Sequence, residues 1–112
     1  MTRLLTEFGL GTSLRRRDYT EAACRAVRDA LWRNSINLAE LFGVEKSAMR
    51  ITVEIGAQEP GAVDADAVAA CFPYGDVTVE LRHGGLDMPR PDGDGNPTVM
   101  VNAAVSVALA DV

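Results

Sequence analysis

A ten-residue segment rich in glycine and arginine, Gly9–Asp18, separates the first apolar stretch of the chain from its first helical pattern. Residues 2–8 mix leucine and phenylalanine with polar residues, which predicts a first strand. Asp18 is suited to cap a helix, and Glu21, three residues later, completes the pattern of a capping box. Alanine, valine and leucine then recur every three or four residues, which is typical of one buried helical face. The chain must therefore turn from a strand into a helix within this segment.

The remainder of the chain carries alternating strand and helix patterns, with no repeat and no linker. Apolar residues alternate with polar ones in Met49–Ile55 and Val77–His83, which predicts two strands with one polar side each. The other expected elements are short helices at Ile36–Phe42 and Asp64–Phe72, a turn-rich loop at Gly84–Pro97 and a last strand, buried on both faces, at Thr98–Leu109. We predict one α+β domain spanning residues 1–112. Its single mixed or antiparallel sheet has about four strands with two or three helices packed on one face, in the order βα(α)βαββ.

Composition and charge narrow the function classes. A chain of 112 residues with 47% hydrophobic and 24% charged residues is ordinary for a globular domain. The sequence has no signal-peptide core and no apolar run near the roughly 20 residues that span a bilayer, so we expect a cytoplasmic protein with no membrane partner. Residues 1–56 hold nine basic and seven acidic residues, whereas residues 57–112 hold two and nine. We expect no nucleic-acid partner, because phosphate contacts need a basic surface.

The three adjacent arginines in the Gly9–Asp18 segment suggest an anion site in an otherwise acidic chain. Glycines let a ligand approach the backbone, hydroxyls and guanidinium groups donate hydrogen bonds, and a helix N-terminus follows. The segment lacks the lysine of a P-loop and the third glycine of a dinucleotide fingerprint. The alternative is a solvated connector. The candidate ligand-binding residues here are Gly9, Gly11, Thr12, Arg15, Arg16, Arg17 and Asp18.

A second candidate region lies at the end of the predicted third strand, where His83 precedes Gly84 and Gly85. His83 could act as a general base, with Ser13 as a candidate nucleophile, and the paired glycines could let a ligand reach backbone N–H groups. The alternative is an ordinary glycine turn after a strand. His83 is the only histidine, so a multi-histidine metal site is excluded, and we expect no metal and no cofactor.

The two cysteines, Cys24 and Cys71, are 47 residues apart and form no CxxC motif. Both fall in apolar stretches of the sequence. We interpret both as small buried hydrophobic residues, with a reactive thiol as the alternative.

Several segments resemble the Lin-type family, small conserved hypothetical proteins of about this length that are marked by a GxGxDxHG motif near the N-terminus. The family has no assigned function, so the resemblance implies a fold and a site location but no reaction. Where the family has Asp and His-Gly, this chain has Ser13 and Arg15-Arg16. The resemblance lies in Gly9-Leu10-Gly11, Asp18 and Thr20, Ala22–Val27, Phe72-Pro73, Gly75, Val77–Val79, Gly84-Gly85 and Val101–Val105.

A fainter similarity links Gly9-x-Gly11 and Asp18-Tyr19-Thr20 to one repeat unit of the ring-opening amidohydrolases, cyanuric acid hydrolase and barbiturase. Those enzymes place three similar units around a shared centre, so the similarity implies a homotrimer or larger ring with sites between subunits. We therefore expect a homo-oligomer that binds a small anionic or polar cyclic metabolite at its subunit interfaces. The alternatives are a hydrolase or isomerase related to these enzymes and a structural or regulatory assembly subunit.

Overall fold

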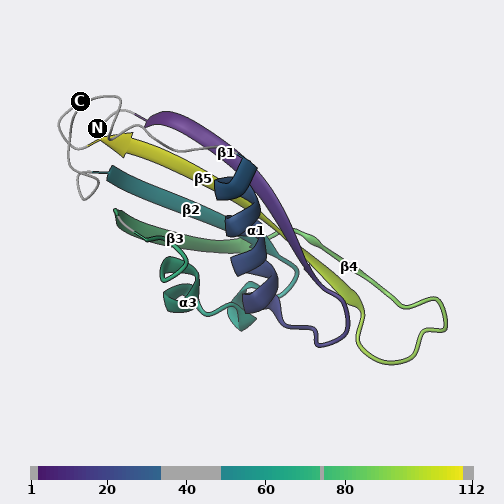
Figure 1. The fold of residues 1–112 in the computed structure, drawn as a ribbon. Helices are drawn as coiled ribbons and strands as arrows, with labels where there is room; N and C mark the ends of the chain where they lie inside the picture. The colour runs from purple at the N-terminus through teal and green to yellow at the C-terminus, as the bar shows by residue number, and fades with distance from the viewer. Residues whose placement is uncertain (1–2, 34–48, 74, 110–112) are drawn as a thin grey trace.

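The structure, a computed structural model, describes residues 3–33, 49–73 and 75–109, and the helix expected at Ile36–Phe42 lies outside these residues. Two long antiparallel strands, β1 and β5, run side by side along the molecule (Figure 1). Neither α-helix in the described part of the chain is long and apolar enough to cross a membrane. The elements are the strands β1 (Arg3–Ser13), β2 (Met49–Ala57), β3 (Asp76–His83), β4 (Leu86–Met88) and β5 (Thr98–Leu109), the helices α1 (Tyr19–Arg33) and α3 (Ala65–Ala69), and the 3₁₀ helix η2 (Pro60–Ala62).

The five strands form one mixed sheet in the order β1-β5-β2-β3, with β4 paired to β5. Strand β5 runs antiparallel to β1, β2 and β4, whereas β2 and β3 are parallel. Strand β2 pairs with β5 as far as Asn102, and β4 takes its place beside residues 98–100. The chain crosses from β3 to β4 at Gly84-Gly85, directly over Gly56. This crossing brings the second candidate region against the end of β2.

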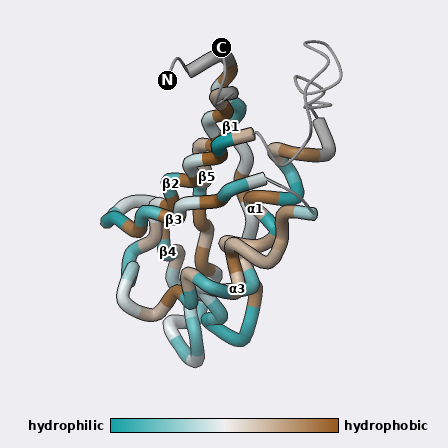
Figure 2. Tube along the Cα trace, turned by 90° about the vertical axis from the view of Figure 1, so that its left-hand side faces the viewer, coloured by the Kyte–Doolittle hydropathy of each residue, from teal (hydrophilic) through white to brown (hydrophobic). Residues whose placement is uncertain are grey.

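Both helices pack on the same face of the sheet (Figure 2). The core lies between this face and the apolar side of α1. Alternate residues of β2 and β5 point into it, and removing each such side chain from water contributes about 1.5–3 kcal/mol. The largest fully buried side chains are Val27, Met49, Val53, Ile55, Val68, Val99, Val101, Val105 and Val107.

Two glycines in β1 allow α1 to approach the strand more closely than any side chain would permit. A Cβ atom at Gly9 would lie 2.2 Å from the carbonyl oxygen of Ala26, and one at Gly11 would lie 2.2 Å from that of Ala22. On the helix, Ala22, Ala26 and Ala30 are spaced four residues apart and are fully buried. Small residues on both elements therefore form a seam of near backbone-to-backbone contact, which we call the glycine–alanine seam.

The structure corrects three sequence-based predictions of the fold. Strand β1 extends to Ser13 rather than ending at residue 8, so only Leu14–Asp18 forms a loop. The expected loop after His83 contains the additional strand β4, which gives five strands rather than about four. Strand β5 is fully buried on one face, whereas on the other Asn102 is exposed and Met100 and Ala104 are only partly buried.

Other predictions are confirmed. The α+β class with one mixed sheet holds, and Asp18 and Asp64 accept hydrogen bonds from the first-turn N–H groups of α1 and α3. The capping box is incomplete, since the Glu21 carboxylate pairs with Arg25 while the Asp18 N–H donates to Ser13 Oγ.

The glycine–alanine seam predicts a large penalty for Gly11→Ala. The added Cβ would meet backbone atoms of Ala22 and Ala26, which can yield only if α1 moves away from β1. We expect the free energy of unfolding to fall by about 1–3 kcal/mol, the usual range for an overpacked core. Urea unfolding measures this change.

The matched control is Gly61→Ala, since a Cβ at Gly61 meets no heavy atom within 4 Å. That variant should stay within about 0.5 kcal/mol of the parent protein. Equal stability of the two variants would contradict the seam.

Candidate functional site

The loop Leu14–Asp18 joins β1 to α1, and contacts with the β4–β5 hairpin hold its backbone. Asn96 Nδ2 donates to the Arg15 carbonyl at 3.1 Å, and Thr98 Oγ1 donates to the Leu14 carbonyl at 3.4 Å. Ser13, only 3% exposed, accepts a hydrogen bond from the Asp18 N–H through its Oγ. The backbone of the loop is therefore fixed at both ends while its arginine side chains extend outward.

The three arginines of this loop have different environments. Arg17, which adopts a φ of 51°, donates to Glu59 at 2.8 Å and lies with its guanidinium carbon 5.9 Å from the centre of the Tyr19 ring. The hydrogen bond that Arg17 donates to the Tyr19 hydroxyl and the charge of Glu59 raise the pKa of Arg17 above its ordinary value. Arg15 and Arg16 are exposed, and neither guanidinium has a counter-ion in the described part of the chain.

Arg15 and Arg16 line an open hollow of about 530 Å³ at the N-terminal end of α1. Arg25, in the second turn of α1, also lines it and is held by Glu21 at 2.7 Å and by the Thr12 carbonyl at 2.6 Å. Three guanidinium groups thus border one hollow with a single carboxylate, that of Glu21, which is already paired. The complete lining is Ser13, Leu14, Arg15, Arg16, Glu21 and Arg25.

A buried hydrogen bond ties the start of α1 to β4. Tyr19 is 3% exposed, and its hydroxyl donates to Asp87 Oδ2. The other carboxylate oxygen, Asp87 Oδ1, is buried and has no hydrogen-bond partner among the described residues. Burial, followed by the hydrogen bond to Asp87, raises the pKa of Tyr19 above its ordinary value. Arg17 approaches the same hydroxyl, with Nε 3.4 Å away.

Four residues that the sequence did not single out connect the two candidate regions: Tyr19, Gln58, Glu59 and Asp87. Tyr19 joins the loop to Asp87, and Arg17 joins it to Glu59. Beside Glu59, Gln58 donates to the carbonyls of Gly84 and Gly85. One sequence signal could have identified the Tyr19–Asp87 contact. Asp87 lies between two apolar residues, Leu86 and Met88, and a carboxylate within a short apolar strand needs a buried partner.

The candidate glycines have close contacts within the protein, and two of them, Gly9 and Gly85, also line an open hollow of about 520 Å³. Gly9 and Gly11 lie in the seam rather than in a loop. Gly85, with a φ of 64°, has the Met100 carbonyl oxygen 2.3 Å from where its Cβ would be, and Gly84 lies against Gly56. Each therefore permits a close backbone approach within the protein itself.

The two candidate catalytic residues are not paired with each other. His83 is exposed at the end of β3, whereas Ser13 is buried at the end of β1, and they share no hydrogen bond. No group of three histidine, cysteine or acidic side chains that could hold a metal is found in the residues that the structure describes.

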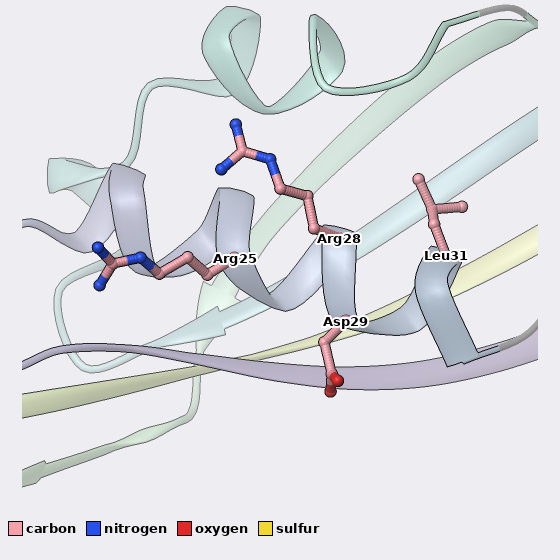
Figure 3. A pocket seen from close by; sticks show the side chains of 4 residues that line it. All are labelled: Arg25, Arg28, Asp29 and Leu31. Atoms are coloured by element: carbon pink, nitrogen blue, oxygen red, sulfur yellow. The ribbon is translucent and has the colours of Figure 1, made fainter.

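Polar side chains of α1 also cover the exposed edge of β1. Asp29 accepts a hydrogen bond from the Leu10 N–H at 3.0 Å, and Arg25 donates to the Thr12 carbonyl. Figure 3 shows Asp29 pointing toward β1 while Arg28 points away from it, on the side of α3. With Leu31, these three residues line a shallow hollow along the helix. Two charged residues of α1, Arg25 and Asp29, thus form hydrogen bonds with backbone groups at the edge of β1.

The Tyr19–Asp87 hydrogen bond predicts a stability loss in Tyr19→Phe. Removing the hydroxyl leaves the Asp87 carboxylate without its partner, and an unsatisfied group of this kind costs about 1–3 kcal/mol of the free energy of unfolding. Since folding raises the pKa of Tyr19, this tyrosine contributes stability that is present below pH 10 and is lost as pH rises through its folded pKa.

Urea unfolding at pH 7 and near pH 10.5 tests both effects. The parent protein should lose more stability between the two pH values than Tyr19→Phe does. A variant that matches the parent at pH 7 would contradict the assigned hydrogen bond.

Comparisons with known proteins agree with this architecture. A family described as conserved hypothetical protein (Lin0512_fam) matches residues 3–107. A crystal structure described as an FtsZ-like protein of unknown function from Nostoc punctiforme PCC 73102 superposes with a TM-score of 0.82 at 31% identity, covering 95% of this chain and 93% of that chain. No curated protein matched. The predicted membership of a small conserved hypothetical family is confirmed, and the chain belongs to the Lin0512 family of conserved hypothetical proteins.

Proposed function

We propose that this protein is a homo-oligomer that binds a small anionic or polar cyclic metabolite in the hollow beside Arg15 and Arg16, where subunits meet. The observation that carries the proposal is that two exposed guanidinium groups have no counter-ion among the residues that the structure describes, in a chain of net charge -5. An acidic chain has many carboxylates that could neutralise them. Neither forms an ion pair with a described carboxylate, and the Glu21 carboxylate in the same hollow is paired with Arg25, so both are available to an external anion.

The donors suit a planar or carboxylate-like ligand. A guanidinium group presents its N–H donors in a fixed plane, which matches two oxygens of one anion. Arg25 is oriented by Glu21 and by the Thr12 carbonyl. Its side chain therefore loses less conformational entropy when a ligand binds. The N–H of Glu21 is already bonded to Asp18, so affinity would rest on the arginines rather than on the helix terminus.

The size and composition of the hollow favour a small metabolite. Its volume of about 530 Å³ falls within the range of ligand pockets. The paired Glu21 carboxylate adds an acceptor next to the donors. A ligand with both anionic oxygens and N–H groups, such as a polar ring, could use both kinds of partner.

Association of copies is supported by the sheet face that the helices leave open. Four large apolar side chains of β1 and β4 lie there more than half exposed: Phe8 at 71%, Leu10 at 54%, Leu86 at 51% and Met88 at 56%. An exposed apolar group of this kind is characteristic of interaction surfaces. A second copy of the chain is the proposed occupant of this surface.

The charges on the same open face fit this proposal. Arg82 pairs with Glu54 at 2.6 Å and approaches Glu80 at 3.7 Å, while Arg50 pairs with Asp76 at 3.5 Å. Each cation is therefore neutralised within its own chain. A second copy can cover such a face without bringing unpaired like charges together.

The anion site predicts ligand-dependent changes at the loop. Titration of the full chain with inorganic phosphate or barbiturate, followed by amide NMR, should perturb the N–H signals of residues 14–18. The double variant Arg15→Ala, Arg16→Ala should weaken binding at least tenfold, because hydrogen bonds to charged groups are worth about 1.5–3 kcal/mol each.

The control for this experiment is Arg28→Ala, Arg90→Ala, which removes the same charge from arginines outside the hollow. It should bind as the parent does. Equal weakening in both double variants would indicate only a general charge effect, and the absence of perturbation by either probe would reject the site.

The association surface predicts a mass well above 12.0 kDa in solution, measured by light scattering after size exclusion. The double variant Phe8→Gln, Leu10→Gln should shift the protein toward the monomer, whereas Leu14→Gln, also on an exposed leucine but in the loop, should not. Apolar association should change little with salt.

A parent protein that remains monomeric on concentration would reject association altogether. Assembly that weakens steeply with salt would instead favour docking of the arginine loop onto acidic surface, because screening acts over about 8–10 Å near physiological ionic strength.

A further inference from the structure

The two cysteines, far apart in sequence, are neighbours in the fold. Cys24 lies on α1 and Cys71 follows α3. The Cys24 thiol donates to the Ala67 carbonyl at 3.7 Å, and the Cys71 thiol donates to the same carbonyl at 3.5 Å. Both sulfur atoms therefore lie against one carbonyl oxygen, that of Ala67. Both thiols are free in this structure, so the molecule holds a facing dithiol that joins two helices.

The two thiols differ in their access to solvent. Cys24 is only 9% exposed, whereas Cys71 is partly exposed. A small reagent would therefore react with Cys71 first, because Cys24 is shielded from solvent. This order resembles that of an attacking and a resolving thiol in disulfide exchange.

Besides the two thiols, hydrogen bonds of Thr20 join α1 to the residues that precede α3. Thr20 Oγ1 donates to the Ala62 carbonyl and accepts from the Asp64 N–H. Val68 is the only residue of α3 that is fully buried. A covalent link at Cys71 would therefore fasten a five-residue helix that few other side chains anchor.

We propose that Cys24 and Cys71 form an oxidation site, in which a small-molecule disulfide converts the dithiol into an intramolecular disulfide between α1 and α3. The inference is independent of the anion site and of the oligomer. Cys24 lies in the core and Cys71 packs partly buried against it, as expected for small hydrophobic residues. The proposal takes up the alternative of a reactive thiol, because both sulfur atoms meet at one carbonyl.

The reaction proceeds in two balanced exchanges. The Cys71 thiolate attacks the small disulfide, forming a mixed disulfide and releasing one small thiol. The Cys24 thiolate then attacks the Cys71 sulfur, closing the Cys24–Cys71 bond and releasing the second small thiol. The protein loses two electrons and two protons, and the small disulfide is reduced to two thiols.

The second exchange should be slow at neutral pH. Burial, together with the Cys71 thiol, raises the pKa of Cys24 to about 12, while the Arg28 charge lowers it and the Asp18 charge raises it. The thiolate is the nucleophile, so the closing rate should increase about tenfold for each pH unit below that pKa. This pH dependence distinguishes closure by buried Cys24 from chance oxidation.

Mass spectrometry of the full chain treated with glutathione disulfide tests the proposal. The parent protein should first gain one glutathionyl group and then lose it, ending two hydrogens lighter than the reduced chain. The control Cys24→Ser should stop at the mixed disulfide. Cys71→Ser should react with glutathione disulfide far more slowly than the parent protein or Cys24→Ser. A jump from pH 5 to pH 7, 8 or 9 after adduct formation isolates the closing step.

Two further measurements keep the outcome decisive. Proteolysis without reductant should give one peptide pair linked through Cys24 and Cys71, and the closed protein should melt several degrees higher than the reduced one, since the bridge closes a long loop. A parent protein that keeps the glutathionyl group at pH 9, as Cys24→Ser does, would overturn the proposal. So would closure between two chains instead of within one.

Discussion

The close approach of α1 to β1 is the constraint on which the rest of the structure depends. At Gly9 and Gly11 the strand presents no side chain, and Ala22 and Ala26 bring the helix backbone to the space where a Cβ would be. Ordinary packing of a helix on a sheet leaves room for side chains between the two layers. Here the distance between helix and sheet is reduced along β1. The helix α1 is therefore held over β1 and β5 in a fixed position along the strands.

That position determines where the arginine loop and the cysteine pair can lie. Because β1 continues to Ser13 and α1 begins at Tyr19, only five residues connect them. Three of these are arginines, and so short a connection cannot bury their charged groups. One face of the same helix carries Cys24 to α3, while Asp29 covers the edge of β1. A shift of α1 would alter all three contacts together.

The sequence predicted the elements whose determinants are local. Asp18 and Asp64 mark helix starts because a cap acts within three residues, and alternation in residues 49–55 defines a strand by itself. The glycines of β1 were misinterpreted for the opposite reason. Glycine usually interrupts a strand, and only the helix packed against it shows that the missing side chain is required.

The parts of the site that sequence reasoning missed depend on contacts between distant residues. Tyr19 and Asp87 are 68 positions apart, and the two thiols that meet at Ala67 come from α1 and from the turn after α3. Strand β4 is three residues long and is defined by its pairing with β5 rather than by its own pattern. The three arginines were correctly placed in a connecting loop because its composition is a local feature, although the loop begins at Leu14 and not at Gly9.

The distribution of protected and unprotected surfaces indicates how copies would meet. An exposed strand edge normally invites pairing with another chain. On β1 the N–H of Leu10 and the carbonyl of Thr12 are already bonded to α1, and the β3 edge strand carries Glu80 and Arg82. Strand addition is thus hindered on both sides of the sheet. The open face has apolar side chains and internally paired charges, so face-to-face association is the arrangement that these surfaces permit.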